Sequence, residues 1–215
     1  VGHPQFEQPY GGSIPAYYAM VARRYMHEYG TTREQLAAVA VNTRAHAVLH
    51  PNAQMRTPIT VEQVLASKPI ADPLRMLDCC LVSDCAGAFI VTSADRARDF
   101  PQPPAYLLGI GEMHTHEHLM CAPSLTHFGS AQSGRIAFEM AGVVPADIDF
   151  AELYDCFTIV PIIELEELGF VERGDGGAFF EAGYARIGGR LPVNTHGGML
   201  SHAHAGAAGA LFGIV

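Results

Sequence analysis

Three histidines within nine residues stand out near the end of the chain. His196 precedes a Gly197-Gly198 turn, His202 and His204 follow it, and a run of alanine and glycine comes next. Small residues let a helix pack closely against another element and let a ligand approach the backbone. An imidazole near a helix start tends to stay neutral at pH 7, so it can donate to an oxyanion or accept a proton. The pattern indicates carbonyl chemistry; the alternative is a glycine-rich turn with solvent-facing histidines.

A second group of reactive residue types lies between 152 and 157, with the sequence Glu-Leu-Tyr-Asp-Cys-Phe. A strand is expected before it and a helix after it. Tyr154 and Asp155 would then stand at the carboxyl end of a sheet, where open α/β folds place their ligands. The alternative is that Asp155 caps the helix and Tyr154 packs against the fold.

A histidine-rich string at 114–118 has the spacing of metal ligands. On a strand, His114, His116 and His118 would share one face, which suits Zn or Ni. Nothing in the sequence identifies a fourth ligand, so we expect no metal, and the alternative is a polar loop.

The five cysteines form a poor disulfide framework, because Cys79 and Cys80 are adjacent and the number is odd. They indicate reduced, buried thiols in a cytosolic protein. A nucleophilic cysteine needs a helix N-terminus or a cation beside it, and Arg75 is the one local cation near Cys79, Cys80 and Cys85. We therefore expect these thiols to pack. The acidic run at 164–167 is expected to be the solvated face of a helix.

The composition excludes several classes of protein. The chain has 215 residues, of which 49% are hydrophobic and 16% charged, enough for one large domain or two small ones. A net charge of −9 argues against a nucleic-acid partner. No apolar run approaches the roughly 18 residues of a membrane span, and no targeting segment is recognisable at Val1. We expect a cytoplasmic protein.

Strands that alternate with helices predict an α/β fold with a mixed, mainly parallel sheet layered with helices. The proline-rich stretch at 101–104 divides the chain into predicted domains 1–103 and 104–215. Helices are expected over residues 16–29, 34–50, 61–66, 94–99, 133–141 and 157–168. Strands are expected over residues 88–92, 105–112 and 150–153.

Five motifs in a fixed order resemble the thiolase superfamily, in particular the sterol-carrier-protein-type thiolases and their aldolase-like relatives. The motifs are residues 6–11 (Phe-Glu-Gln-Pro-Tyr-Gly), 71–80 (including Ala-Asp-Pro-Leu and Leu-Asp-Cys-Cys), 91–94 (Val-Thr-Ser-Ala), 152–157 and 194–198 (Asn-Thr-His-Gly-Gly). The resemblance implies a thiolase-like fold. It also implies that the chain corresponds to the middle and late part of the family chain, with an incomplete N-terminal half and most of the C-terminal half.

The resemblance also implies roles for individual residues. Tyr154-Asp155-Cys156-Phe157 stands where thiolases have Asn-Glu-Ala-Phe, a motif that orients a water and contacts substrate. His204 stands where a Gly-His-Pro motif supplies the catalytic histidine, although both of its neighbours differ. Tyr154 and His204 are thus the implied proton-transfer and oxyanion residues, and Asp155 orients. Asn194, Gly197, Gly198 and Phe157 are the implied substrate-side residues.

Three functions remain open at this point. The first is a thiolase-type acyltransferase that makes or breaks a carbon–carbon bond next to a coenzyme A thioester carbonyl, with no other cofactor. The second is a retro-aldolase that cleaves a steroid-like β-hydroxyacyl-CoA; Tyr154 fits this branch, and His202 stands where it has a second tyrosine and is an acid/base candidate. The third is a non-catalytic subunit that binds acyl-CoA or lipid. The family implies a homodimer and, in the aldolase branch, a small zinc-ribbon and OB-fold partner.

Overall fold

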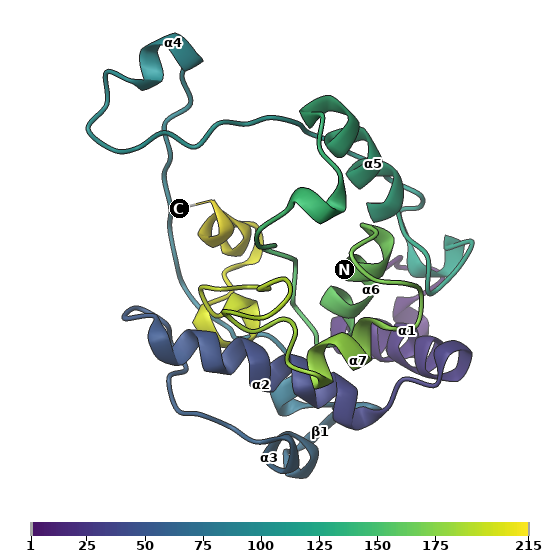
Figure 1. Ribbon diagram of the computed structural model, residues 1–215. Helices are drawn as coiled ribbons and strands as arrows, with labels where there is room; N and C mark the ends of the chain where they lie inside the picture. The colour runs from purple at the N-terminus through teal and green to yellow at the C-terminus, as the bar shows by residue number, and fades with distance from the viewer. Residues whose placement is uncertain (1, 215) are drawn as a thin grey trace.

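Helices dominate the computed structural model, which describes residues 2–214 (Figure 1). None of the helices in this part of the chain is long and apolar enough to cross a membrane. The α-helices are α1 (Ile14–Tyr29), α2 (Arg33–Leu49), α3 (Val61–Ala66), α4 (Ala94–Ala97), α5 (Ser130–Ala141), α6 (Ile159–Glu167) and α7 (Gly176–Glu181). Single 3-10 turns occupy Gln8–Tyr10, Met76–Asp78, Leu119–Cys121 and Pro145–Asp147, a longer 3-10 helix spans Gly206–Gly213, and a π-helical turn spans Gly198–His202.

Local capping signals explain where α2 and α3 begin. The Thr32 hydroxyl accepts the Gln35 N–H at 3.2 Å, and the Gln35 side chain accepts the Thr32 N–H at 3.1 Å. Thr60 and Gln63 form the same reciprocal pair before α3. Such capping boxes satisfy backbone donors that the helix itself leaves unpaired. The predicted helices are confirmed, α3 with the predicted bounds and the others with shifted ends.

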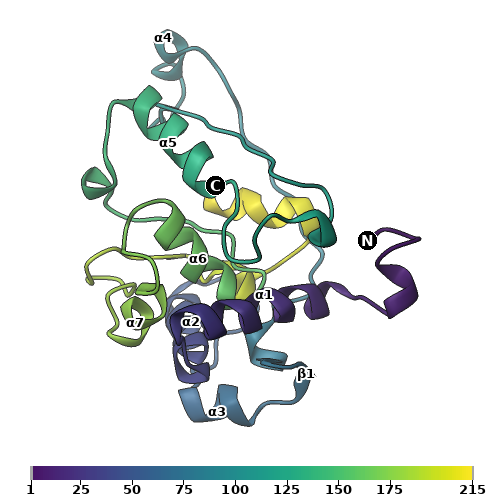
Figure 2. The same ribbon diagram turned by 90° about the vertical axis from the view of Figure 1, so that its right-hand side faces the viewer.

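The main core lies between α1, α2, α6 and α7, which Figure 2 shows stacked at one end of the molecule. Tyr25, Leu36, Ile162 and Leu165 are fully buried there. Helix α7 was not among the predicted helices, and its first two residues, Gly176 and Gly177, are poor helix formers. A side chain at Gly176 would meet the Ile162 carbonyl, so glycine lets α7 lie directly against α6.

The expected solvated face at 164–167 is wrong for Glu166. Its side chain is buried and accepts hydrogen bonds from the Tyr25 hydroxyl and from the Gly176 N–H at 2.9 Å. Arg173 lies 3.4 Å from its second oxygen. A buried carboxylate is tolerable only when paired and hydrogen-bonded, and Glu166 meets both conditions.

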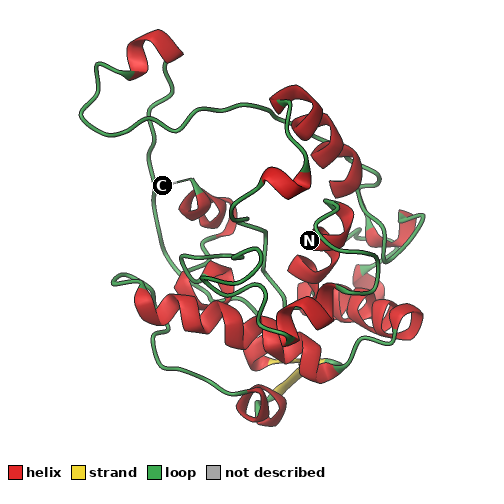
Figure 3. Cartoon of the chain, viewed as in Figure 1, coloured by secondary structure: helices red, strands yellow, loops and turns green. Residues whose placement is uncertain are grey.

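The three predicted strands do not form strands in the described part of the chain. The one sheet found there is the antiparallel pair β1 (Pro69–Ala71) and β2 (Leu74–Arg75), drawn yellow in Figure 3. Residues 88–92 and 105–112 are extended without a ladder, and 150–153 forms a single parallel bridge between Ala151 and Val193. A strand needs a hydrogen-bonded neighbour, and the two extended segments have none here. Residues 88–92 and the first residues of 105–112 form an arm with α4 that stands away from the core in Figures 1 and 2. The later part of 105–112 lies against α5, where a side chain at Gly109 or Gly111 would meet the helix backbone.

Candidate active site

The Asp155 carboxylate binds backbone N–H groups of the π-helical turn Gly198–His202. One carboxylate oxygen accepts the Met199 N–H at 2.6 Å, and the other accepts the Leu200 N–H at 3.4 Å. Complete burial raises the pKa of Asp155 to about 7, while these two N–H groups oppose the rise. Gly198 has φ +57°, and a side chain there would overlap the Asp155 carboxylate. The turn therefore requires glycine at 198 for both backbone and space.

Helix α2 supports the same loop from the opposite side. Buried Arg44 donates to the Ser201 hydroxyl and to the Thr57 carbonyl, each at 2.9 Å. The Nε2 of His46 accepts the Ile187 N–H at 3.1 Å, so its Nδ1 carries the proton and donates to the Asn194 carbonyl, also at 3.1 Å. Burial lowers the pKa of His46, which keeps the imidazole neutral.

These α2 residues were not among the predicted site residues, although the sequence carries a signal for them. Residues 42–46 read Asn-Thr-Arg-Ala-His within a helix that is otherwise rich in alanine and valine. The four polar side chains within residues 42–46 are all buried. Polar groups clustered in an apolar helix need partners from other segments, so such a cluster points to a hydrogen-bonded junction.

Asn194 joins the loop to the segment before Tyr154. Its side-chain oxygen accepts the Leu153 N–H at 2.7 Å, and its own N–H donates to the Ala151 carbonyl at 2.9 Å. Its φ of +56° lies in the left-handed region that Asn adopts more readily than most residues. Asn194 is buried, so its polar atoms serve this junction.

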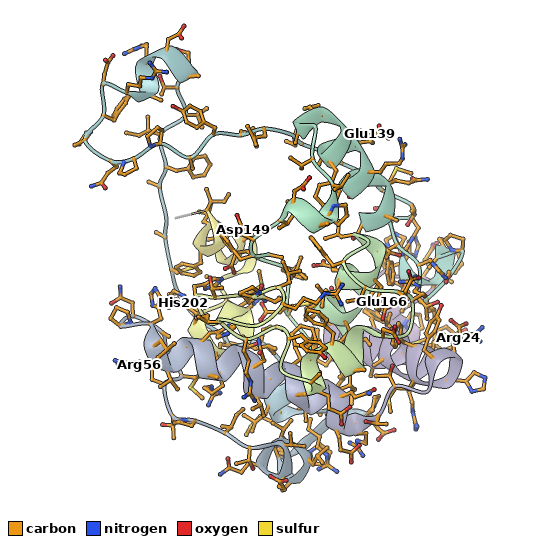
Figure 4. All side chains as sticks on the ribbon, in the orientation of Figure 1. Arg24, Arg56, Glu139, Asp149, Glu166 and His202 are labelled. Carbon is orange, nitrogen blue, oxygen red and sulfur yellow. The ribbon has the colours of Figure 1, made fainter. Side chains whose placement is uncertain are left out.

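Buried His202 and half-buried His196 form a pair. Their Nδ1 atoms are 2.9 Å apart, and the Nε2 of His196 lies 3.3 Å from a Glu152 oxygen. The His202 ring stacks on Phe212 with centroids 4.5 Å apart, and it lies beside α2 in Figure 4. Burial, together with the neighbouring imidazoles that include His50, lowers the pKa of both histidines to about 4. This pair is therefore neutral at pH 7.

The structure brings Tyr154 and His204 together. Their rings meet edge to face with centroids 6.3 Å apart. His204 borders an open groove of about 490 Å³ formed with residues 81–85, and its buried Nε2 has no hydrogen-bond partner among residues 2–214. Burial raises the pKa of the Tyr154 phenol well above its ordinary value, so the phenol stays protonated and acts as a donor.

Tyr154 borders an apolar cavity of about 340 Å³. Aromatic and aliphatic side chains of α1, α6 and the segment 116–130 form its wall, and Glu164 lies among them; the lining includes Tyr17, Tyr18, Val21, Leu119, Phe128 and Ile163. Phe157 lies behind this wall, where its ring stacks on Tyr18 at 4.5 Å. His202 is not among the residues that border the cavity or the groove.

Glu164 is a second correction to the expected solvated helix face. It borders the cavity, and its carboxylate accepts the Tyr154 N–H at 3.0 Å. Burial raises the pKa of Glu164 to about 8, and the charges of Asp155 and Glu167 add to the rise.

The remaining sequence candidates lie elsewhere. Burial raises the pKa of Cys79 to about 12 and that of Cys80 in the same direction, so these thiols stay protonated. His114, His116 and His118 lie in a loop rather than on a strand. Within the described chain, no group of three or more His, Cys, Asp or Glu side chains gathers as metal ligands would.

Known proteins with similar sequences and structures come from one superfamily. Residues 111–215 match the family described as thiolase C-terminal domain-like. An acetyl-CoA acetyltransferase of Methanothermobacter thermautotrophicus is 44% identical over 201 residues, which cover 93% of this chain and 52% of that protein. A steroid side-chain-cleaving aldolase of Thermomonospora curvata is 43% identical over 203 residues, which cover 91% of this chain and 52% of that protein.

A solved structure agrees with these relatives. The Ltp2–ChsH2(DUF35) aldolase superposes with a TM-score of 0.87 at 38% identity, covering 96% of this chain and 56% of that chain. The chain thus spans about half the length of the relatives that it matches. The resemblance to the thiolase superfamily is confirmed: the chain has a thiolase-like fold, and residues 111–215 form a thiolase C-terminal domain-like region.

Proposed function

We propose that this protein acts on a coenzyme A thioester and makes or breaks the carbon–carbon bond next to the thioester carbonyl. One observation carries the proposal: Tyr154 borders an apolar cavity, His204 borders an open groove, and the two rings meet edge to face. The cavity suits an apolar acyl group, and the groove leaves room for the thioester. A neutral phenol and an unpartnered imidazole nitrogen are suitable donors to an enolate oxygen.

Aldol cleavage of a β-hydroxyacyl-CoA is the form of this chemistry that the site supports best. Tyr154 supplies a protonated phenol where thiolytic relatives have Asn or His. Similarity to a steroid side-chain-cleaving aldolase adds support. Thiolase-type acyl transfer is the second candidate, and 44% identity to an acetyl-CoA acetyltransferase favours it.

The other candidate residues receive supporting roles in this proposal. Asp155, Asn194, Gly197 and Gly198 shape the loop that presents His204, and Phe157 backs the cavity wall. His202 stays an acid/base candidate, although its enclosure supports a role in holding the loop. A domain boundary near 101–104 stays a prediction, which the family match from residue 111 supports.

The partners are proposals as well. The similar aldolase structure pairs Ltp2 with ChsH2(DUF35), so we propose a DUF35-type partner for this protein. Co-expression with such a protein and size-exclusion chromatography with light scattering test that pairing. The same measurement on the protein alone distinguishes the predicted homodimer from a monomer.

The test of function is an assay of the protein, alone and with a DUF35-type protein, on β-hydroxyacyl-CoA thioesters. Release of a ketone or aldehyde supports aldol cleavage, and an acyl group trapped on a cysteine supports transfer. Tyr154→Phe and His204→Ala are expected to lower kcat by about 10²–10³-fold, since each removes one donor to the oxyanion. Tyr106→Phe, on the exposed arm, is the matched control. Tight acyl-CoA binding without turnover would instead indicate a binding subunit.

A further inference from the structure

Glu164 is placed like a reactive group rather than a structural one. It lies on α6, and it is the one carboxylate among the described residues that border the apolar cavity. No lysine or arginine borders that cavity, so Glu164 has no counter-ion there. An ionisable side chain in an apolar pocket, without an ion-pair partner, is a common mark of a functional residue.

The hydrogen bonds of Glu164 leave half of its carboxyl group free. One oxygen accepts the Tyr154 N–H at 3.0 Å, which fixes the side chain beside that tyrosine. The other oxygen accepts no hydrogen bond from residues 2–214, and the protein does not fully enclose it. Glu166, two residues later, has both oxygens engaged with Tyr25, Gly176 and Arg173.

We propose that Glu164 is a second proton-transfer residue of this site, which acts beside Tyr154 on a hydroxyl or carbonyl group of an acyl chain held in the cavity. This inference rests on the proposed function and adds a base to it. The Tyr154 phenol is held protonated, so it serves as a donor and leaves the part of the base unfilled.

In aldol cleavage, the Glu164 carboxylate takes the proton of the β-hydroxyl group. The O–H electron pair becomes the second bond of the new carbonyl, and the bond between Cα and Cβ breaks. Its electron pair moves onto the thioester as an enolate, whose oxygen accepts a hydrogen bond from Tyr154. Glu164 then returns the proton to Cα, which gives a ketone or aldehyde and the shortened acyl-CoA.

The titratable groups around Glu164 predict a distinctive pH dependence. Tyr17 and Tyr18 on α1, Tyr154 and His116 border the same cavity, while Asp155 and Glu167 contribute negative charge from nearby. Because the pKa of Glu164 is raised to about 8, the carboxylate fraction grows as the pH rises through that value. A base in this position makes kcat/KM increase with pH up to about 8.

The experiment compares Glu164→Gln, Glu164→Asp and the exposed control Glu172→Gln in the same cleavage assay. Glutamine can still accept the Tyr154 N–H, so Glu164→Gln is expected to fold, and its thermal unfolding checks this. We expect kcat to fall by about 10²–10⁴-fold with little change in KM, partial recovery in Glu164→Asp, and wild-type rates in Glu172→Gln. In ¹³C-glutamate NMR spectra, one carboxyl resonance should titrate near pH 8 and disappear in Glu164→Gln.

The outcomes separate this inference from the function on which it rests. A wild-type protein inactive in every acyl-CoA assay would overturn both. An active wild type with an equally active Glu164→Gln variant would overturn only the role of Glu164. Loss of activity in Glu164→Gln without loss of the pH-dependent limb near 8 would also overturn it, because a positioning residue would leave that limb in place.

Discussion

Replacing Gly198 with alanine should destabilise the protein for two separable reasons. The first is backbone strain: φ is +57° at Gly198, and a left-handed conformation costs a non-glycine residue about 1–2 kcal/mol. The second is a clash, because the new methyl group would overlap the Asp155 carboxylate. Displacing Asp155 forfeits charge-assisted hydrogen bonds to Met199 and Leu200, which are worth about 1.5–3 kcal/mol. The expected loss in free energy of unfolding is about 2.5–5 kcal/mol.

Gly188 supplies a matched control for the strain alone. Its φ is +83°, and a methyl group there would meet no atom within 4 Å. Gly188→Ala should therefore lose about 1–2 kcal/mol in urea denaturation followed by circular dichroism. In an Asp155→Ala background the clash disappears, so Gly198→Ala should cost about as little as the control. Equal losses for Gly198→Ala and Gly188→Ala in the wild-type background would refute the role assigned to Asp155.

Three further predictions concern stability. The pKa values of His196 and His202 are lowered from 6.5 to about 4 in the folded protein. Between pH 4 and pH 6.5 the unfolded chain therefore binds more protons than the folded one. The stability that this pair contributes is complete above pH 6.5 and is lost as the pH falls toward 4. The slope of unfolding free energy against pH should flatten in His202→Gln, and an unchanged slope would contradict this. Glu166→Ala should cost about 3–5 kcal/mol, because it leaves the Tyr25 hydroxyl and the Gly176 N–H without their acceptor and removes one of the two carboxylates beside Arg173. Glu139→Ala, in an exposed pair with Arg135, should change the free energy of unfolding by less than about 1 kcal/mol. Leu74→Ala should cost about 2–5 kcal/mol because Leu74 is fully buried, against about 0.5 kcal/mol or less for Leu107→Ala, whose side chain is 82% exposed; similar melting curves would contradict the burial.

Helices were predictable because their determinants are local. Thr32 and Thr60 begin α2 and α3 through partners three residues away, and Gly30 ends α1 in a left-handed conformation. Strands depend on neighbours that sequence patterns do not reveal. Residues 88–92 have β-branched and apolar side chains, yet no ladder forms around them in the described chain, and Ile90 is 77% exposed. The pattern specified an extended conformation and not its pairing.

The prediction that the acidic run on α6 is solvent-exposed was wrong for a related reason. Charge alone predicts solvent exposure, since isolated carboxylates are rarely buried. Glu166 is buried because Tyr25, Gly176 and Arg173, distant or later in sequence, converge on it. The residue types at 164–167 do not indicate those partners, so the sequence pattern does not distinguish Glu166 from a surface glutamate.

Hydrogen-bond partners also separate residues that build the site from residues that can react in it. Asp155 and Asn194, both put forward from sequence, give their side-chain oxygens to backbone N–H groups of Met199, Leu200 and Leu153. An acceptor committed to the backbone is poorly placed to take a proton from a substrate, since doing so would release the loop it holds. Among the described residues that border the cavity or the groove, Nε2 of His204, one oxygen of Glu164 and the Tyr17 hydroxyl have no hydrogen-bond partner. Proton transfer is therefore assigned to residues that the fold leaves unsatisfied, and one of these, Glu164, carries no motif by which sequence could single it out.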